Sequence, residues 1–253
     1  MKLCILDNDE LDPSMVPVYT GYGAMTEKLL RQAGAQDWSI EIFHPPRMDY
    51  PDSFERFDAV LLTGSKADSF SDEAWVVELR RRVTQLLQER KKLLGICFGH
   101  QLIALCLGAK VGRAPQGWGV GRNTYAWKSS RAEFAVPHDT LSLLASHQDQ
   151  VLELPAQADL LASNAHCPVA AYAVGTQVFC VQAHPEFVED YSAFLLQRRR
   201  ERLGEAIYGP AMASLDQGHD GAVVARMMVQ FIEGKSAPCA ALPARATQGT
   251  AIA

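Results

Sequence analysis

The chain has 253 residues and a formal net charge of −5, a length that suits one large domain or two small ones. Hydrophobic residues make up 48 % of the chain and charged residues 21 %, so enough apolar surface is present for a substantial core. The negative net charge excludes a chain-wide electrostatic surface for nucleic acid, and no apolar run approaches the roughly 18 residues that span a bilayer. We therefore expect a globular protein that binds neither nucleic acid nor membrane.

The N-terminus and the cysteines indicate the compartment. Residues 1–7 read as a short strand that enters a polar turn, without the length or the small-residue cleavage site of a signal peptide. The six cysteines are scattered and form no Cys-x-x-Cys pair, so we expect reduced thiols at Cys4, Cys97, Cys106, Cys167, Cys180 and Cys239. Both features predict a cytoplasmic protein.

Strand and helix patterns alternate in the first half of the chain. Strands are predicted at 2–6, 39–43, 59–62 and 93–96. Helices are predicted between and after them, at 23–34, 72–91 and 101–107. This alternation predicts right-handed crossovers and an open, mostly parallel sheet with helices on both faces.

The pattern changes from about Gly119. Strands now follow without helices between them, at 123–127, 132–136, 169–173 and 177–182, which predicts an antiparallel extension or the far half of the sheet. Helices are predicted at 187–207 and 222–233, and the run Arg198–Arg200 reads as a solvated helix face. We expect a single α/β domain over residues 1–234 and a disordered tail over residues 235–253, which has little to bury.

The most informative segment is Gly-x-Cys-x-Gly, formed by Gly95, Cys97 and Gly99 between a predicted strand and a predicted helix. Such a strand-to-helix turn holds its central residue in a strained conformation, and the flanking glycines leave room for that backbone. The sulfur would project from the edge of the sheet at a helix N-terminus, where the helix dipole favours a thiolate. The segment therefore predicts that Cys97 is a nucleophile.

Other interpretations of this part of the chain are weaker. A buried, inert cysteine in a tight glycine turn would explain the motif in isolation, but not its place between strand and helix. Cys97 and His100 form a Cys-x-x-His pair, yet no second pair is placed to complete a metal site. The glycine-rich run 116–121 lacks the strand and helix that flank a dinucleotide-binding loop. We expect no metal and no cofactor.

A base for the nucleophile is predicted at the end of the strand 177–182. His184 follows this apolar strand, and carboxyl ends of parallel strands are where active sites of open α/β folds collect. Glu186 comes two residues later, so in extended chain both side chains point to one side. A carboxylate there can hold one imidazole nitrogen and leave the other to face the thiol. A helix-capping turn is the alternative for His-Pro-Glu alone.

Further candidates follow other strands. Gly64 ends the buried strand 59–62 in a turn, and its N–H could form a two-donor oxyanion hole with the N–H of Phe98. A simple glycine turn is the alternative. The polar segment 146–149 is either a surface turn or, through Ser146 and His147, a source of hydrogen bonds to a charged substrate head group.

Together these segments resemble the class I, triad-type glutamine amidotransferase domain. The resemblance covers roughly residues 1–200 and rests on 95–101 and 183–186, with support from 62–65 and 146–149. It implies a flavodoxin-like fold in which Cys97 attacks the side-chain amide of glutamine, giving a γ-glutamyl thioester and ammonia. His184 would move protons with Glu186 behind it. The other implied contacts are oxyanion stabilisation by Gly64 and Phe98 and substrate binding by Gln101, Ser146 and His147.

The leaving group stays open at this point. Nothing after residue 234 reads as a synthase domain, so the chain resembles the stand-alone group that includes γ-glutamyl peptidases. We expect a glutamine amidotransferase or glutaminase, either with a separate synthase subunit or as a homo-oligomer. The alternative is a γ-glutamyl peptidase that cleaves a γ-glutamyl amine or a glutathione-type conjugate. A non-catalytic redox sensor with an oxidised Cys97 is a third hypothesis, which the intact His184 and Glu186 pair disfavours.

Overall fold

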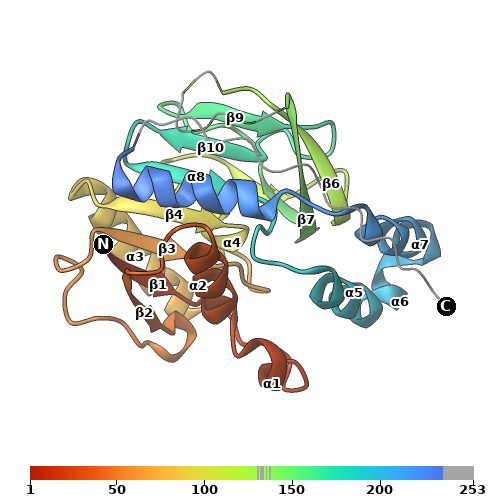
Figure 1. Cartoon of the computed structure of the whole chain (residues 1–253), viewed down its shortest axis with the longest axis horizontal. Coiled ribbons are helices and arrows are strands. Elements are labelled where there is room, and N and C mark those ends of the chain that lie inside the picture. The colour runs from red at the N-terminus through yellow and green to blue at the C-terminus, as the bar shows by residue number, and fades with distance from the viewer. Residues whose placement is uncertain (130, 132–133, 135, 137, 236–253) are drawn as a thin grey trace.

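A mixed sheet forms the centre of the computed structural model, which describes residues 1–129, 131, 134, 136 and 138–235 (Figure 1). Within these residues the sheet has nine strands in the order β2-β1-β3-β4-β11-β10-β9-β6-β7. The first five are mutually parallel: β2 (Ser39–Phe43), β1 (Lys2–Leu6), β3 (Ala59–Leu62), β4 (Lys92–Ile96) and β11 (Val178–Val181). The other four pair antiparallel: β10 (Ala171–Val174), β9 (Asp159–Ser163), β6 (Gly119–Trp127) and β7 (Thr140–His147).

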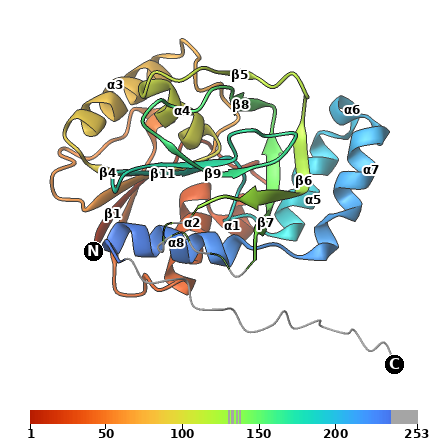
Figure 2. The same cartoon turned by 90° about the horizontal axis from the view of Figure 1, so that it is seen from above.

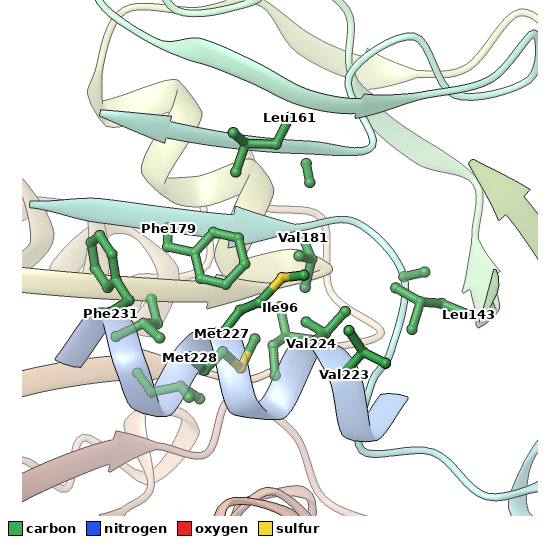
Figure 3. Packing of buried hydrophobic residues seen from close by; sticks show 14 of the residues in the cluster. Ile96, Leu143, Leu161, Phe179, Val181, Val223, Val224, Met227, Met228 and Phe231 are labelled. Carbon is green, nitrogen blue, oxygen red and sulfur yellow. The ribbon is translucent and has the colours of Figure 1, made fainter. Parts of the chain in front are cut away.

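Helices cover both faces of the parallel half of the sheet. One face packs against α2 (Tyr22–Gln32) and α8 (Gly221–Glu233), and the other against α3 (Ala74–Gln88) and α4 (Phe98–Cys106). Figure 3 shows α8 laying Val224, Met227 and Phe231 against Ile96 and Phe179 of the sheet. The expected flavodoxin-like α/β architecture with an antiparallel extension is confirmed.

Short elements complete the fold at the sheet edges. A small antiparallel pair, β5 (Val111–Arg113) and β8 (Asp149–Val151), lies near α4. Three helices lie on the outer side of β6 and β7 (Figure 2): α5 (Glu189–Arg198), α6 (Arg200–Leu203) and α7 (Glu205–Ala213). The remaining short helices are α1 (Val16–Tyr19), η1 (Pro45–Arg47) and η3 (Leu215–Gln217).

The central parallel strands were predictable because they are apolar on both faces, whereas the outer strand β2 alternates polar and apolar residues. All four residues of β3 are fully buried, as a strand covered by helices on two sides requires. The amphipathic α3 likewise buries Val76, Leu79, Val83 and Leu86 at helical spacing. The carboxyl ends of β3, β4 and β11 therefore meet at one sheet edge, which positions the residues described below.

The single helix predicted at 187–207 is wrong. The chain bends at Arg199 and again at Gly204, whose φ of 71° lies in the region that favours glycine, so three short helices form instead. The strands β5, β7, β8 and β9 were not predicted. The strand predicted at 132–136 falls largely outside the described residues, as does the tail after Lys235.

Candidate active site

Cys97 lies in a sharp turn between β4 and α4. Its backbone has φ 51° and ψ −101°, a strained conformation for a residue other than glycine. The Cys97 N–H donates to the carbonyl of Val181 at 3.0 Å, which ties the turn to the neighbouring strand β11. The residue is only 5 % exposed, and it occupies the N-terminus of α4, where the first N–H groups of the helix lack intrahelical acceptors.

Two glycines make this turn sterically possible. A Cβ at Gly95 would lie 2.6 Å from the carbonyl carbon of Gly99, and a Cβ at Gly99 would lie 2.5 Å from the carbonyl oxygen of Leu62. Both distances are shorter than any side chain tolerates against backbone. The Gly-x-Cys-x-Gly pattern is therefore required by the close approach of α4 to β3 and β4.

His184 and Glu186 follow β11 and lie at the same edge. The Nδ1 atom of His184 is 2.7 Å from Oε1 of Glu186, and both residues are 4 % exposed. The backbone N–H of His184 donates to the carbonyl of Leu144 at 2.9 Å. The imidazole ring of His184 stacks on the ring of Phe187, with the centroids 3.8 Å apart. These contacts fix the plane of the imidazole and direct Nδ1 to the carboxylate.

The charge of His184 is set by two opposing effects. Burial alone would lower the pKa of His184, but the negative charges of Glu186 and of the Cys97 thiolate, with their hydrogen bonds, raise that pKa to about 10. The imidazolium form is consequently favoured at neutral pH. A thiolate beside an imidazolium is the arrangement needed for nucleophilic attack followed by protonation of a leaving amine.

Gly64 adjoins both reactive groups. A Cβ at Gly64 would lie 2.7 Å from Cε1 of His184 and 3.5 Å from Cβ of Cys97, so only glycine fits here. Phe98 begins α4, and its N–H therefore lacks an intrahelical acceptor. The loop that carries Gly64 is held by Asn8, whose N–H donates to Oγ1 of Thr63 at 2.9 Å and whose Nδ2 donates to the Thr63 carbonyl at 3.0 Å. The sequence gives no local signal for this role of Asn8, because its partner Thr63 is 55 residues away.

A pocket of about 180 Å³ opens beside Cys97 and contains the predicted substrate contacts. Gln101, Ser146 and His147 all line it, so the segment 146–149 is not a simple surface turn. The Gln101 Nε2 group donates to the Asp149 carbonyl at 2.8 Å and to Gln182 Oε1 at 3.1 Å, which fixes the side chain. Burial lowers the pKa of His147 to about 3, so this imidazole is neutral.

An acidic and basic cluster in the same pocket was not predicted. The guanidinium of Arg113 bonds Asp149 Oδ1 at 2.8 Å and Asp68 Oδ2 at 2.9 Å. Burial raises the pKa of Asp149 to about 6, against the lowering effect of Arg113. No local motif could reveal this cluster, because its members lie on three separate segments.

The interpretation of Arg198–Arg200 as a solvated helix face is wrong for Arg199. This side chain is half-buried, lines the pocket and donates from Nη1 to the hydroxyl of Ser146. It also lines a second, smaller space of about 30 Å³ beside Cys97, together with Gly64 and His184. Arg199 itself lies at the junction between the end of α5 and the start of α6.

The described residues contain neither a metal-binding cluster nor a membrane-spanning helix. No group of three or more His, Cys, Asp or Glu residues in the described ranges is arranged to hold a metal ion. His100, the partner of Cys97 in the Cys-x-x-His pair, is fully buried and packs on Tyr172 with the ring centroids 4.9 Å apart. Among the same residues no helix combines the length and apolarity that crossing a bilayer requires.

The chain is similar to known proteins over most of its length. The family described as glutamine amidotransferase class-I matches residues 18–196. The chain is 34 % identical over 175 residues to γ-glutamyl peptidase 3 of Arabidopsis thaliana, covering 66 % of this chain and 70 % of that protein. It is 34 % identical over 150 residues to a glutamine-hydrolyzing GMP synthase of Ralstonia pickettii, covering 54 % and 27 %. A glutamine amidotransferase structure from Thermotoga maritima matches with a TM-score of 0.74 at 17 % identity, covering 92 % and 98 %.

The chain belongs to the class-I glutamine amidotransferase family, because the family match spans well over half of it. The protein is accordingly a hydrolase that acts on amide C–N bonds. The likeness to the Thermotoga structure shows the same fold over nearly the whole of both chains. The roles of individual residues in the site stay predictions.

We predict that Gly99→Ala slows alkylation of Cys97 by iodoacetamide at least tenfold and lowers the free energy of unfolding by about 1–3 kcal/mol. The added Cβ would lie 2.5 Å from the Leu62 carbonyl oxygen and push α4, and with it the turn, away from β3. Peptide mapping by mass spectrometry measures the alkylation, and urea denaturation measures the stability.

Gly209→Ala is the matched control for this substitution. Gly209 lies within α7, and a Cβ there would meet nothing within 4 Å, so stability should hold or rise slightly. Unchanged Cys97 alkylation and stability in Gly99→Ala would contradict the account of the turn.

Proposed function

We propose that the protein hydrolyses a γ-glutamyl amide bond through a γ-glutamyl thioester on Cys97. The observation that carries this proposal is the meeting of three features at one sheet edge. Cys97 occupies a strained strand-to-helix turn, a buried His184 and Glu186 pair lies beside it, and Gly64 adjoins both groups. A redox sensor would need the thiolate but not the buried proton carrier.

Attack on the amide uses the charge state that the site favours. The thiolate of Cys97 adds to the γ-carbonyl carbon, and the carbonyl oxygen becomes an oxyanion. In this proposal the N–H groups of Gly64 and Phe98 donate to that oxyanion, and such donors usually contribute the largest electrostatic term in acyl transfer. The strained, buried turn keeps the sulfur aligned without reorganisation during the reaction.

Proton transfer then decides which bond of the tetrahedral intermediate breaks, the C–S bond or the C–N bond. The imidazolium of His184 gives its proton to the leaving nitrogen, the C–N bond breaks, and the γ-glutamyl group remains on sulfur. The neutral imidazole next takes a proton from water, whose oxygen attacks the thioester. Collapse of this second intermediate releases glutamate and restores the thiolate and imidazolium. Glu186 holds Nδ1 of His184 throughout, which keeps the other ring nitrogen directed toward the reacting atoms.

The larger pocket suits the α-amino and α-carboxylate groups of the γ-glutamyl half. Its carboxylates Asp149 and Asp68 can bind the ammonium, while the backbone around Ser146 and His147 can bind the carboxylate. The fixed side chain of Gln101 forms one wall of this pocket. These contacts select the γ-glutamyl group and leave the amine unspecified.

For the leaving group we propose an amine larger than ammonia, as in a γ-glutamyl peptidase. The similarity to γ-glutamyl peptidase 3 of Arabidopsis extends over 70 % of that protein, whereas it covers only 27 % of the Ralstonia GMP synthase. Hydrolysis of glutamine for a separate synthase subunit is the second candidate, which the same GMP synthase similarity supports.

Cys97→Ala is predicted to lower the rate of glutamate release from a γ-glutamyl dipeptide by at least about 10³-fold, because the nucleophile is lost. Cys106→Ala is the control, since Cys106 lies at the other end of α4 and lines neither pocket beside Cys97. The assay compares γ-glutamyl dipeptides with glutamine. Turnover of glutamine alone would remove the peptidase proposal, and full activity of Cys97→Ala would remove the mechanism.

The kcat/KM for γ-glutamyl substrates should fall as the pH drops through about 6, because Asp149 becomes protonated there and loses its attraction for the α-ammonium. His184 does not titrate in this range, since its raised pKa keeps it charged well above neutrality. In Asp149→Asn the kcat/KM should already be low at pH 7.5 and should lose its dependence on pH near 6. An unchanged acid limb in Asp149→Asn would show that another group controls it.

A further inference from the structure

Two guanidinium groups flank the ring of Trp118 at the edge of the site. The Cζ atom of Arg199 lies 5.4 Å from the ring centroid, and the Cζ atom of Arg202 lies 5.0 Å from it. Arg199 comes from the junction of α5 and α6, and Arg202 from α6. Contact with the aromatic face holds both side chains in place without neutralising them.

The cations around Cys97 differ in how they are neutralised. Lys66 and Arg113 pair with carboxylates, because Lys66 Nζ lies 2.9 Å from Asp9 and Arg113 bridges two aspartates. Arg199 instead bonds the neutral hydroxyl of Ser146, and Arg202 bonds the side-chain amide of Gln148 at 3.3 Å. Within the described ranges neither of these two arginines lies within 4.0 Å of a carboxylate oxygen.

The arginines on either side of Arg199 in sequence provide the contrast. Arg198 pairs with Asp12 at 3.2 Å, and Arg200 pairs with Glu205 at 2.6 Å. Arg199 alone of this run turns toward the pocket, half-buried and without an anion. A partly desolvated cation that lacks an anionic partner is a binding group for an anion on a ligand.

Arg199 lies beside the two groups that act on the leaving amine in the proposed mechanism, Cys97 and His184. The leaving nitrogen must approach His184 to receive its proton, and Arg199 lines the same space as His184, Gly64 and Cys97. A group attached to the leaving nitrogen therefore comes close to Arg199. Arg202 lines only the larger pocket.

We propose that Arg199 binds a carboxylate on the leaving amine, and that the preferred substrates are γ-glutamyl amino acids or short γ-glutamyl peptides with a free carboxylate. In a γ-glutamyl amino acid that carboxylate is attached two bonds from the scissile nitrogen. A guanidinium has five N–H donors, and the bond to Ser146 uses one, so donors remain for a bidentate contact. This inference rests on the proposed hydrolysis at Cys97 and assigns its leaving group.

The experiment compares pairs of substrates that differ only in this charge. The kcat/KM is measured for γ-glutamyl-alanine and its C-terminal amide, for γ-glutamyl-alanyl-glycine and its amide, and for glutamine. The unmodified protein should prefer the acid of at least one pair by about tenfold or more, the size of a charge-assisted hydrogen bond. In Arg199→Met the ratio of kcat/KM for the acid to kcat/KM for its amide should fall to about one.

Arg198→Met is the matched control, because it removes a cation from the same run that is exposed and paired with Asp12. It should keep the preference for the acid, and Arg199→Glu should reverse that preference. An equal fall on acids and amides in Arg199→Met, or no preference in the unmodified protein, would overturn the assignment of Arg199 alone. No turnover of any γ-glutamyl compound by the unmodified protein would overturn the proposed function as well.

Discussion

Backbone packs directly against backbone where α4 leaves the sheet. The Gly99 position of α4 leaves no room for a Cβ against Leu62 of β3, and the Gly95 position leaves none against Gly99. This contact forces the chain to reverse at Cys97 with a positive φ. The sulfur is thereby held at the start of α4 and beside the carboxyl ends of β3 and β11. Gly64 follows β3 and His184 follows β11, so both residues reach the sulfur from the same edge of the sheet.

Three buried histidines have pKa values shifted in opposite directions, according to the charged groups beside them. His100 and His147 are buried without a carboxylate ion pair in the described part of the chain, and burial lowers the pKa of each to about 3. His184 is buried just as deeply, but Glu186 and the Cys97 thiolate raise its pKa to about 10. The same low-polarity interior thus keeps two imidazoles neutral and makes the third a proton donor. Among the groups that raise the pKa of His184, Glu186 has the largest effect.

Local patterns account for what the sequence could predict. The doubly buried strands, the Gly-x-Cys-x-Gly turn and the two-residue spacing of His184 and Glu186 are each contained in a short segment. The Arg113 cluster and the inward turn of Arg199 depend on how distant segments pack, and the pair of Arg113 and Asp149 is separated by 36 residues. Gly204 was a visible signal for a break in the predicted helix 187–207, and its positive φ explains why the break occurs.

The central claim is that the γ-glutamyl group passes through a covalent bond to Cys97. Rapid acid quenching during turnover of a γ-glutamyl dipeptide, followed by intact-protein mass spectrometry and peptide mapping, tests it most directly. The account predicts one γ-glutamyl adduct, carried by the peptide that contains Cys97, sensitive to hydroxylamine and absent from Cys97→Ser. An adduct on another residue, or steady turnover with no adduct at the shortest quench times and equal activity in Cys97→Ser, would contradict it.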